Sequence, residues 1–219
     1  METKLISVTQ SHIEGVTTPE ELIVYTARVS NPENQMNMET SDRLVKYLIK
    51  HKHWSPFEMV DLTVEIKTSR AIAAQILRHR SFSFQEFSQR YSAVTKIEDI
   101  QLRAAGATNR QSSLEPCNPR LFNDFVSGEV AITEHMKLST ELYEELLKAG
   151  VAKECARMVL PLATETTLYM KGSVRSWIHY LQIRCDETTQ LEHREIALNI
   201  LDIFKVEFPN IFKAIFSHD

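Results

Sequence analysis

The spacing of apolar residues changes several times along the chain, and each change predicts a new element. Between residues 41 and 51 the apolar side chains fall on one helical stripe. Residues 59–67 then alternate between apolar and polar side chains, which is the period of a strand with one buried face. Residues 69–79 return to helical spacing. The pattern therefore predicts helix, strand and helix in succession, with the run Arg78-His79-Arg80 at the end of the second helix.

Helix signals also dominate the rest of the chain. Thr18 can cap a helix that has Pro19 at its first position and acidic residues in its first turn. The threonine-rich residues 163–171 predict a second strand. Further helices are predicted over residues 18–30, 118–150, 151–160, 174–184 and 189–208, the last ended by Pro209. The predicted fold class is α/β of the α+β kind: helix-rich, with a small antiparallel or mixed sheet flanked by helices, in a single domain over residues 1–219.

Residues 94–118 interrupt this regular pattern. They are polar, have mixed periodicity and include the run Asn109-Arg110-Gln111-Ser112-Ser113. We interpret them as a long loop with room for a short helix. Long loops in compact domains are often functional.

Glycine is scarce, and its scarcity excludes two kinds of nucleotide site. Only five glycines occur in 219 residues, and no two are close together. Rossmann fingerprints and Walker loops need clustered glycines, because there the backbone must approach phosphate closely. Any nucleotide bound by this chain must therefore rely on side chains.

Charge and cysteine content indicate which partners and which cellular compartment suit this chain. The formal net charge is −4, which argues against a general nucleic-acid binder. The three cysteines are widely spaced, which disfavours a disulfide framework and suits a reducing compartment. The chain shows neither a signal-peptide pattern nor an apolar run long enough to span a membrane. These features predict a soluble cytoplasmic protein with no membrane partner.

The densest polar segment is RHRSFSFQEFSQRYS, residues 78–92, in which three arginines are interleaved with phenylalanines. Burying part of it would make unpaired arginines costly, and an anionic ligand would offset that cost. Two other interpretations stay open on these residues alone: a solvated basic turn beside an aromatic cluster, or a nucleotide- or RNA-binding regulatory module. A metal hydrolase built on His51, His53, His79 and Asp61 is a further alternative, although no HExxH or HD motif supports it. No metal site is predicted.

Four ordered motifs resemble those of the flavin-dependent thymidylate synthases. Arg78-His79-Arg80 followed after seven residues by Ser88 matches the RHR-x7-S motif. Upstream, His53-Trp54-Ser55-Pro56-Phe57-Glu58 is similar to H-x-(S/T)-P-F-E. Downstream, Ala156-Arg157-Met158-Val159-Leu160-Pro161 is similar to A-R-x-x-L-P, and the series Arg175, His179, Arg184 resembles the family's late arginine segment. Together these matches cover most of the chain.

The resemblance implies an activity, a cofactor and an assembly. The activity is reductive methylation of dUMP to dTMP, with the methylene group from methylenetetrahydrofolate and reducing power from NADPH through FAD. The implied fold is α/β, and the implied assembly is a homotetramer with active sites shared between subunits.

The resemblance also assigns residues to the substrate. Arg184 would be the catalytic arginine, stabilising negative charge that develops on the pyrimidine ring. For Arg157 alone, the residues favour a helix ion pair with Glu154. The family uses no cysteine nucleophile, so Cys185 is interpreted as a packing residue. The positions implied for dUMP binding are Gln75, Arg78, Glu86, Ser88, Gln89, Arg90, Arg157 and Arg184.

A second set of positions is implied for the flavin. Gln85, Ser173 and His179 depart from the commonest family pattern but keep hydrogen-bonding capacity. The positions implied for FAD binding are His53, Ser55, Glu58, Arg78, His79, Arg80, Glu86, Ser173, Arg175 and His179.

Overall fold

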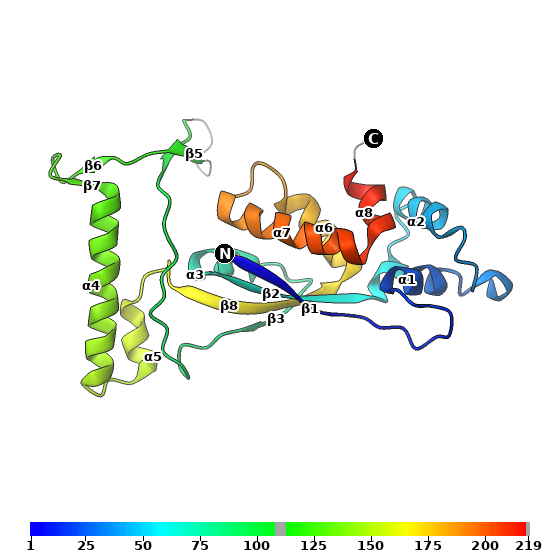
Figure 1. The fold of residues 1–219 in the computed structure, drawn as a ribbon, viewed down its shortest axis with the longest axis horizontal. Coiled ribbons are helices and arrows are strands. Elements are labelled where there is room, and N and C mark those ends of the chain that lie inside the picture. The colour runs from blue at the N-terminus through cyan, green and yellow to red at the C-terminus, as the bar shows by residue number, and fades with distance from the viewer. Residues whose placement is uncertain (108–112, 218–219) are drawn as a thin grey trace. The chain divides into compact units, whose positions relative to one another are not determined.

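The computed structural model describes residues 1–107 and 113–217 (Figure 1). Four residues of the polar run predicted as loop, Asn109–Ser112, lie outside the described residues. Contacts divide the chain into two compact units. The first unit comprises Met1, Lys67–Arg78 and Glu86–Leu168. The second comprises Glu2–Ile66, His79–Gln85 and Tyr169–Asp219.

A four-stranded sheet has the strand order β1-β2-β8-β3. Its strands are β1 (Glu2–Val8), β2 (Asp61–Ser69), β8 (Glu165–Ser173) and β3 (Ser83–Glu86). Strands β2 and β8 run in opposite directions: Val174 N–H donates to Val60 O (2.9 Å) at one end, and Arg70 N–H donates to Thr164 O (3.0 Å) at the other. The alternation predicted for residues 59–67 is present, because every second residue of β2 is buried. The predicted small sheet is therefore confirmed.

The helices of the second unit carry several of the largest fully buried side chains, among them Trp177, Tyr180 and Phe204. In Figure 1, α6 and α7 lie along one another, and contacts join α7 to β1. Trp177 of α6 is fully buried, and its indole N–H donates to Leu62 O (2.9 Å). The helices are α1 (Pro19–Ala27), η1 (Pro32–Asn34), α2 (Ser41–Lys50), η2 (Ser55–Glu58), α6 (Val174–Arg184), α7 (Leu191–Glu207) and α8 (Pro209–Phe216). The predicted helix start at Thr18 is confirmed, since Thr18 and Glu21 form a capping box.

The first unit is built around a long helix, with α5 and η3 packed against it. Its helices are α3 (Arg70–Ile76), α4 (Gly128–Lys148), α5 (Lys153–Ala156) and η3 (Arg157–Val159). Two small antiparallel hairpins complete it: β4 (Arg103–Ala105) with β5 (Ser113–Pro116), and β6 (Arg120–Leu121) with β7 (Val126–Ser127).

Three local predictions differ from the structure. The long helix starts at Gly128 rather than Asn118, because Phe122, Asn123 and Asp124 adopt positive φ and turn the chain into the β6–β7 hairpin. In the described part of the segment 94–118, the structure has strands where a short helix was allowed for. Helix α3 ends at Ile76, so the run Arg78-His79-Arg80 follows the helix instead of ending it.

No helix within the described residues combines the length and the apolar character needed to cross a membrane. The prediction of one domain over residues 1–219 stays a prediction.

Candidate active site

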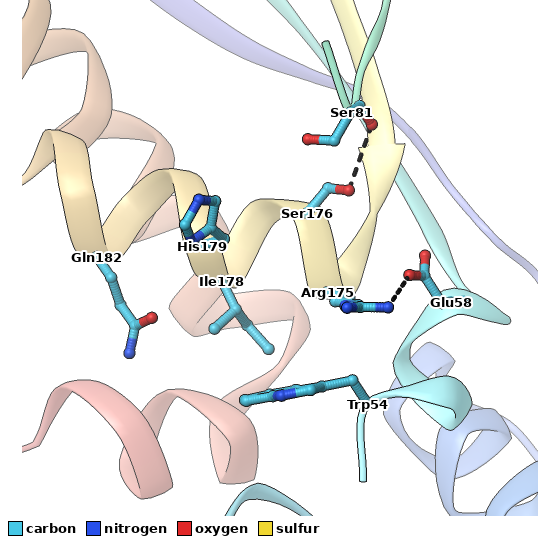
Figure 2. A pocket seen from close by; sticks show the side chains of 8 residues that line it. All are labelled: Trp54, Glu58, Ser81, Arg175, Ser176, Ile178, His179 and Gln182. Atoms are coloured by element: carbon cyan, nitrogen blue, oxygen red, sulfur yellow. Dashed lines mark hydrogen bonds and ion pairs between the residues drawn. The ribbon is translucent and has the colours of Figure 1, made fainter. Parts of the chain in front are cut away.

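A cavity of about 410 Å³ opens in the second unit beside helix α6 (Figure 2). Its walls come from η2 with the residue before it, the loop that follows His79, and one face of α6. The volume falls within the usual range for small-molecule sites. The lining residues are Trp54, Glu58, Ser81, Arg175, Ser176, Ile178, His179 and Gln182.

Helix geometry explains why α6 supplies most of this wall. Arg175, Ile178, His179 and Gln182 follow the spacing i, i+3, i+4, i+7 and therefore lie on one helix face. The helix begins directly after β8, where the Ser173 hydroxyl accepts a hydrogen bond from Ser176 N–H (3.4 Å). Figure 2 shows the Trp54 indole facing this helix across the cavity. The site thus joins a flat aromatic surface to a polar helix face.

Glu58 organises one end of the cavity. The Ser173 hydroxyl donates to one of its carboxylate oxygens (2.5 Å), and Arg175 Nη1 donates to the other (3.0 Å; Figure 2). The buried Ser173 therefore orients the Glu58 carboxylate, and this carboxylate in turn holds the Arg175 guanidinium in place. Arg175 stays exposed beside the cavity and offers further guanidinium donors to an anion.

Arg184, at the last turn of α6, is anchored by His79. Its Nε–H donates to His79 Nε2 (2.9 Å). Burial, with the positive charge of Arg184 and then His179 adding to it, lowers the pKa of His79 to about 4. His79 is therefore neutral near pH 7 and able to accept this hydrogen bond.

Phe82 fixes the loop that carries His79. Its ring is buried, with centroids 4.7 Å from Trp177 and 5.8 Å from Tyr180. Gly172 makes room for it, because a Cβ there would lie only 2.5 Å from Phe82 Cδ1. A ring held in this way is not displayed for stacking on a nucleic-acid base, which weakens the RNA-binding alternative for residues 78–92.

In the first unit, Arg70 holds the segment that begins at Glu86. Arg70 Nη1 donates to Glu86 Oε1 (3.3 Å), and Nη2 donates to Phe87 O (3.1 Å). The Thr166 hydroxyl donates to the same Glu86 oxygen (3.0 Å), and Phe87 N–H donates to Thr167 O (2.9 Å). These contacts fix the start of the stretch Glu86–Arg90, which supplies four of the positions expected to bind dUMP.

Gln89 and Arg90 of that stretch, together with Arg157, carry donors that the described chain satisfies only in part. Arg90 Nε lies 3.2 Å from Glu154 Oε2 in an exposed ion pair, so Glu154 pairs with Arg90 and not with Arg157 as the residues alone favoured. Two buried nitrogens, Arg157 Nε and Gln89 Nε2, have no hydrogen-bond partner among the described residues. Buried donors without a partner are costly unless a ligand satisfies them.

The other expected positions lie outside the cavity lining. His53 and Ser55 are exposed, and the His53 ring lies 5.9 Å from Tyr47 and 6.1 Å from His51. Arg78 N–H donates to Gln75 O (3.3 Å), just past the end of α3. Gln75 and Ser88 are half-buried, whereas Arg78 and Arg80 are exposed.

Sequence reasoning missed two kinds of residue. Ile178 and Gln182 share the helical spacing of Arg175 and His179, so the period of α6 was a usable signal for them. Trp54, Ser81 and Arg70 had no comparable signal, because their roles depend on contacts distant in sequence.

The environment of Cys185 does not favour a nucleophile. Burial raises the pKa of the Cys185 thiol to about 11, which disfavours the reactive thiolate. No group of three or more His, Cys, Asp or Glu side chains is placed to hold a metal ion in the part of the chain that the structure describes.

Comparison with known proteins adds sequence relatives. Residues 11–210 match the family model described as "Thymidylate synthase complementing protein". A probable flavin-dependent thymidylate synthase of Paramecium bursaria Chlorella virus 1 is 52% identical, over 98% of this chain and 99% of the relative. A flavin-dependent thymidylate synthase of Synechocystis is also 52% identical, again over 98% of this chain and 99% of the relative.

Two solved structures have a fold similar to that of this chain. The UMP/dUMP methylase PolB from Streptomyces cacaoi, in its crystal structure with 5-Br dUMP, is similar with a TM-score of 0.77 and 25% identity. The match covers 97% of this chain and 93% of PolB. The same enzyme with 5-Br UMP gives a TM-score of 0.78.

Proposed function

The chain belongs to the flavin-dependent thymidylate synthases, and from this premise we propose that it converts dUMP to dTMP by reductive methylation. FAD is the cofactor of this family, NADPH is the reductant and methylenetetrahydrofolate is the carbon donor. The match of the family model across residues 11–210 carries the proposal. The same match supports a single functional domain over residues 1–219.

The cavity beside α6 suits part of a flavin dinucleotide. Arg175 offers a cation for a phosphate, Ser81 and Ser176 offer hydroxyls, and Trp54 offers a flat apolar surface. His179 lines the same wall, and Ser173 and Glu58 hold Arg175 in place. When bound, FAD supplies the reducing equivalents for the methyl group. We assign His53, Ser55, Arg78, His79, Arg80 and Glu86 to the flavin as well, on the family motifs.

The phosphate of dUMP is assigned to Arg90 and Arg157, with Ser88 and Gln89 beside them. The buried Arg157 Nε and Gln89 Nε2, which lack partners in the described chain, support this assignment. A dianion bound here would compete with Glu154 for Arg90. Gln75, Arg78 and Glu86 complete the proposed nucleotide contacts.

Arg184 is assigned to the pyrimidine ring. Positive charge fixed beside the ring stabilises negative charge that develops there and makes carbon 5 a better partner for the methylene group. With Nε held by His79, the two terminal nitrogens remain to face the substrate. No cysteine nucleophile is required, in keeping with the raised pKa of Cys185.

The active form is proposed to be a homotetramer with shared sites. Helix α4 carries exposed apolar side chains, among them Leu138 and Leu142, as expected of a helix that packs against another subunit. The three cysteines are free, which supports a reducing, cytoplasmic location.

The direct test is a dTMP-formation assay with FAD, NADPH and methylenetetrahydrofolate. The purified protein is expected to be yellow and to form dTMP only when all three are present. A colourless protein that cannot be reconstituted with FAD, or one that forms no dTMP, would refute the proposed function.

Arg184→Ala tests the assigned role of the arginine. We expect turnover to fall about 100- to 1,000-fold, the loss typical of removing one fixed donor at a developing charge. Flavin content, measured from the visible spectrum, should change little, because Arg184 is assigned to the pyrimidine ring and not to the flavin. Loss of flavin in proportion to activity would contradict the role.

A further inference from the structure

Two fully buried side chains stand behind the pair formed by His79 and Arg184. Tyr180 lies on α6, one helical turn before Arg184, and His193 lies on α7. The motifs that define the family resemblance include neither residue. Both have 0% exposed surface, so any effect they have on a substrate must pass through a neighbour.

The contacts form a continuous chain from α7 to the site. The Tyr180 hydroxyl and His193 Nε2 are 3.0 Å apart in a hydrogen bond. The Tyr180 ring meets the His79 ring edge-on, with centroids 4.9 Å apart and planes at 76°. His79 Nε2 then accepts from Arg184 Nε (2.9 Å). Tyr180 and Arg184 share one face of α6, because they are four residues apart.

This chain of contacts controls the plane of the guanidinium. A guanidinium is rigid and planar, so fixing Nε and the Cδ end leaves Nη1 and Nη2 with one orientation. Among the described residues, Arg184 forms no other side-chain hydrogen bond or ion pair, so His79 alone sets that orientation. His79 is on a loop, and its ring depends on what packs against it. Tyr180 fills that position, and the bond to His193 keeps the Tyr180 hydroxyl in one place.

Of the four residues in this series of contacts, only Arg184 is charged near pH 7. Burial is the main cause for both histidines: it lowers the pKa of His193 to about 3 and that of His79 to about 4. Burial also raises the pKa of Tyr180. Because His79 is neutral, its Nε2 can accept the hydrogen bond from Arg184. His79, Tyr180 and His193 then add no charge beside the substrate.

We propose that Tyr180 and His193 are positioning residues that hold the His79 ring, and through it orient Arg184 toward the pyrimidine of the substrate. This inference rests on the proposed function for the identity of the substrate. The contacts that lead from His193 to Arg184 do not depend on the proposed function.

Tyr180→Phe is the main test, because it removes the hydroxyl and keeps the ring. We expect kcat, measured well below Tm, to fall about tenfold with flavin content close to wild type. Tm should drop by only a few degrees, because one buried hydrogen bond is lost. Tyr143→Phe is the matched control: Tyr143 is also fully buried, and its hydroxyl has no partner among the described residues. Its kcat should stay within about twofold of wild type. His193→Leu should behave like Tyr180→Phe, and His193→Gln, which can still bond the hydroxyl, should recover most of the lost kcat.

A double-mutant cycle separates orientation of Arg184 from general stability. In an Arg184→Lys background, Tyr180→Phe should have little further effect on kcat, because the oriented guanidinium is already gone. If Tyr180→Phe lowered kcat by the same factor in the Arg184→Lys background as in wild type, the proposal would be overturned. It would also be overturned if Tyr180→Phe were as active as Tyr143→Phe. Loss of flavin and Tm in step with kcat would overturn it as well.

A spectroscopic measurement covers the case in which no enzyme activity is found. In protein with ¹⁵N-labelled histidine, the His79 Nε2 signal should show an unprotonated, hydrogen-bonded nitrogen, assigned by its loss in His79→Asn. Tyr180→Phe and His193→Leu should change this signal, whereas Tyr143→Phe should not. An unchanged signal in both would overturn the positioning role. A changed signal in a protein that makes no dTMP would support the positioning role and refute the proposed function.

Discussion

Individual arginines of this chain differ in how firmly they are held. Arg70 bonds both Glu86 and Phe87 O, and Arg184 bonds His79. The pair Arg90–Glu154 is looser, with side chains 60% and 56% exposed. The sequence could suggest Glu154 as a partner for its neighbour Arg157, but only the fold brings Glu154 to Arg90. The motifs therefore named Arg90, Arg157 and Arg184 as candidates, but neither Arg70 nor the partners of these arginines.

The Arg90–Glu154 pair predicts that Glu154 opposes substrate binding. Glu154→Gln should tighten dUMP binding about two- to fivefold, because an exposed pair contributes roughly 0.2–1 kcal/mol and its removal frees Arg90. Arg90→Ala should weaken dUMP binding by about 1.5–3 kcal/mol, the value of a hydrogen bond to a charged group. Titration calorimetry measures both. Glu145→Gln, which removes a carboxylate paired with Lys148 on α4, serves as the control and should leave affinity unchanged.

The two neutral histidines predict a loss of stability in acid. A group whose pKa falls on folding binds more protons when unfolded, so stability is full above pH 6.5 and declines as the pH drops toward the folded value. For His79 the decline extends to about pH 4 and for His193 to about pH 3. Each histidine should contribute up to about 1.4 kcal/mol per pH unit in this window. Between pH 7 and 4, the free energy of unfolding measured with urea should depend less steeply on pH in His193→Gln than in wild type. Equal pH dependence in the two proteins would contradict a lowered pKa for His193.

At the scale of elements, the sequence predicted long periodic segments well and short ones poorly. Helix α6 begins and ends at the predicted residues, and β2 buries the predicted face. Strand β3 is four residues long and lies inside the arginine-rich segment, so its charge pattern concealed it. Pro209 was predicted only as the end of a helix, yet it also occupies the first turn of α8. Short strands and second helices of this kind depend on tertiary partners that periodicity does not report.

Helix α8 depends on a cap supplied by another helix. Its own preceding residue, Phe208, provides no side-chain cap. Glu20 of α1 does so instead, accepting from Ile211 N–H (2.8 Å), Asn210 N–H (3.3 Å) and Asn210 Nδ2 (2.8 Å). The carboxylate thus satisfies backbone donors at the positive end of the α8 dipole.

Removing this cap should loosen α8 without touching the active site. We expect Glu20→Ala to lower the free energy of unfolding by about 1–2 kcal/mol, as for other lost caps. Glu20→Gln should cost less, because its amide oxygen still accepts a hydrogen bond. Hydrogen exchange should localise the change to α8, and Glu33→Gln, on an exposed turn, should have no effect. Uniform loss of protection across the second unit would contradict a local role.

At the scale of the whole molecule, fold class and family followed from ordered motifs, although the arrangement of the site did not. Scarce glycine excluded phosphate loops, and the structure instead surrounds its candidate sites with arginine, serine and histidine side chains. Gly172 is one position where glycine is needed, because it admits the Phe82 ring. A motif specifies which residues matter, whereas a contact such as Ser173–Glu58 exists only after folding.

Helix α4 supplies the test of the whole assembly. Leu138 and Leu142 of α4 are 65% and 47% exposed within one chain. Burying the parts that are still exposed against another subunit would contribute roughly 0.7–2 kcal/mol each. The variant Leu138→Glu with Leu142→Glu should therefore sediment as a smaller species and lose more than about tenfold of its activity, because shared sites come apart. Lys137→Glu, which adds a carboxylate to the polar face, should keep both mass and activity. A smaller species that retained full turnover would show that each chain carries a complete site, and it would overturn the shared-site tetramer.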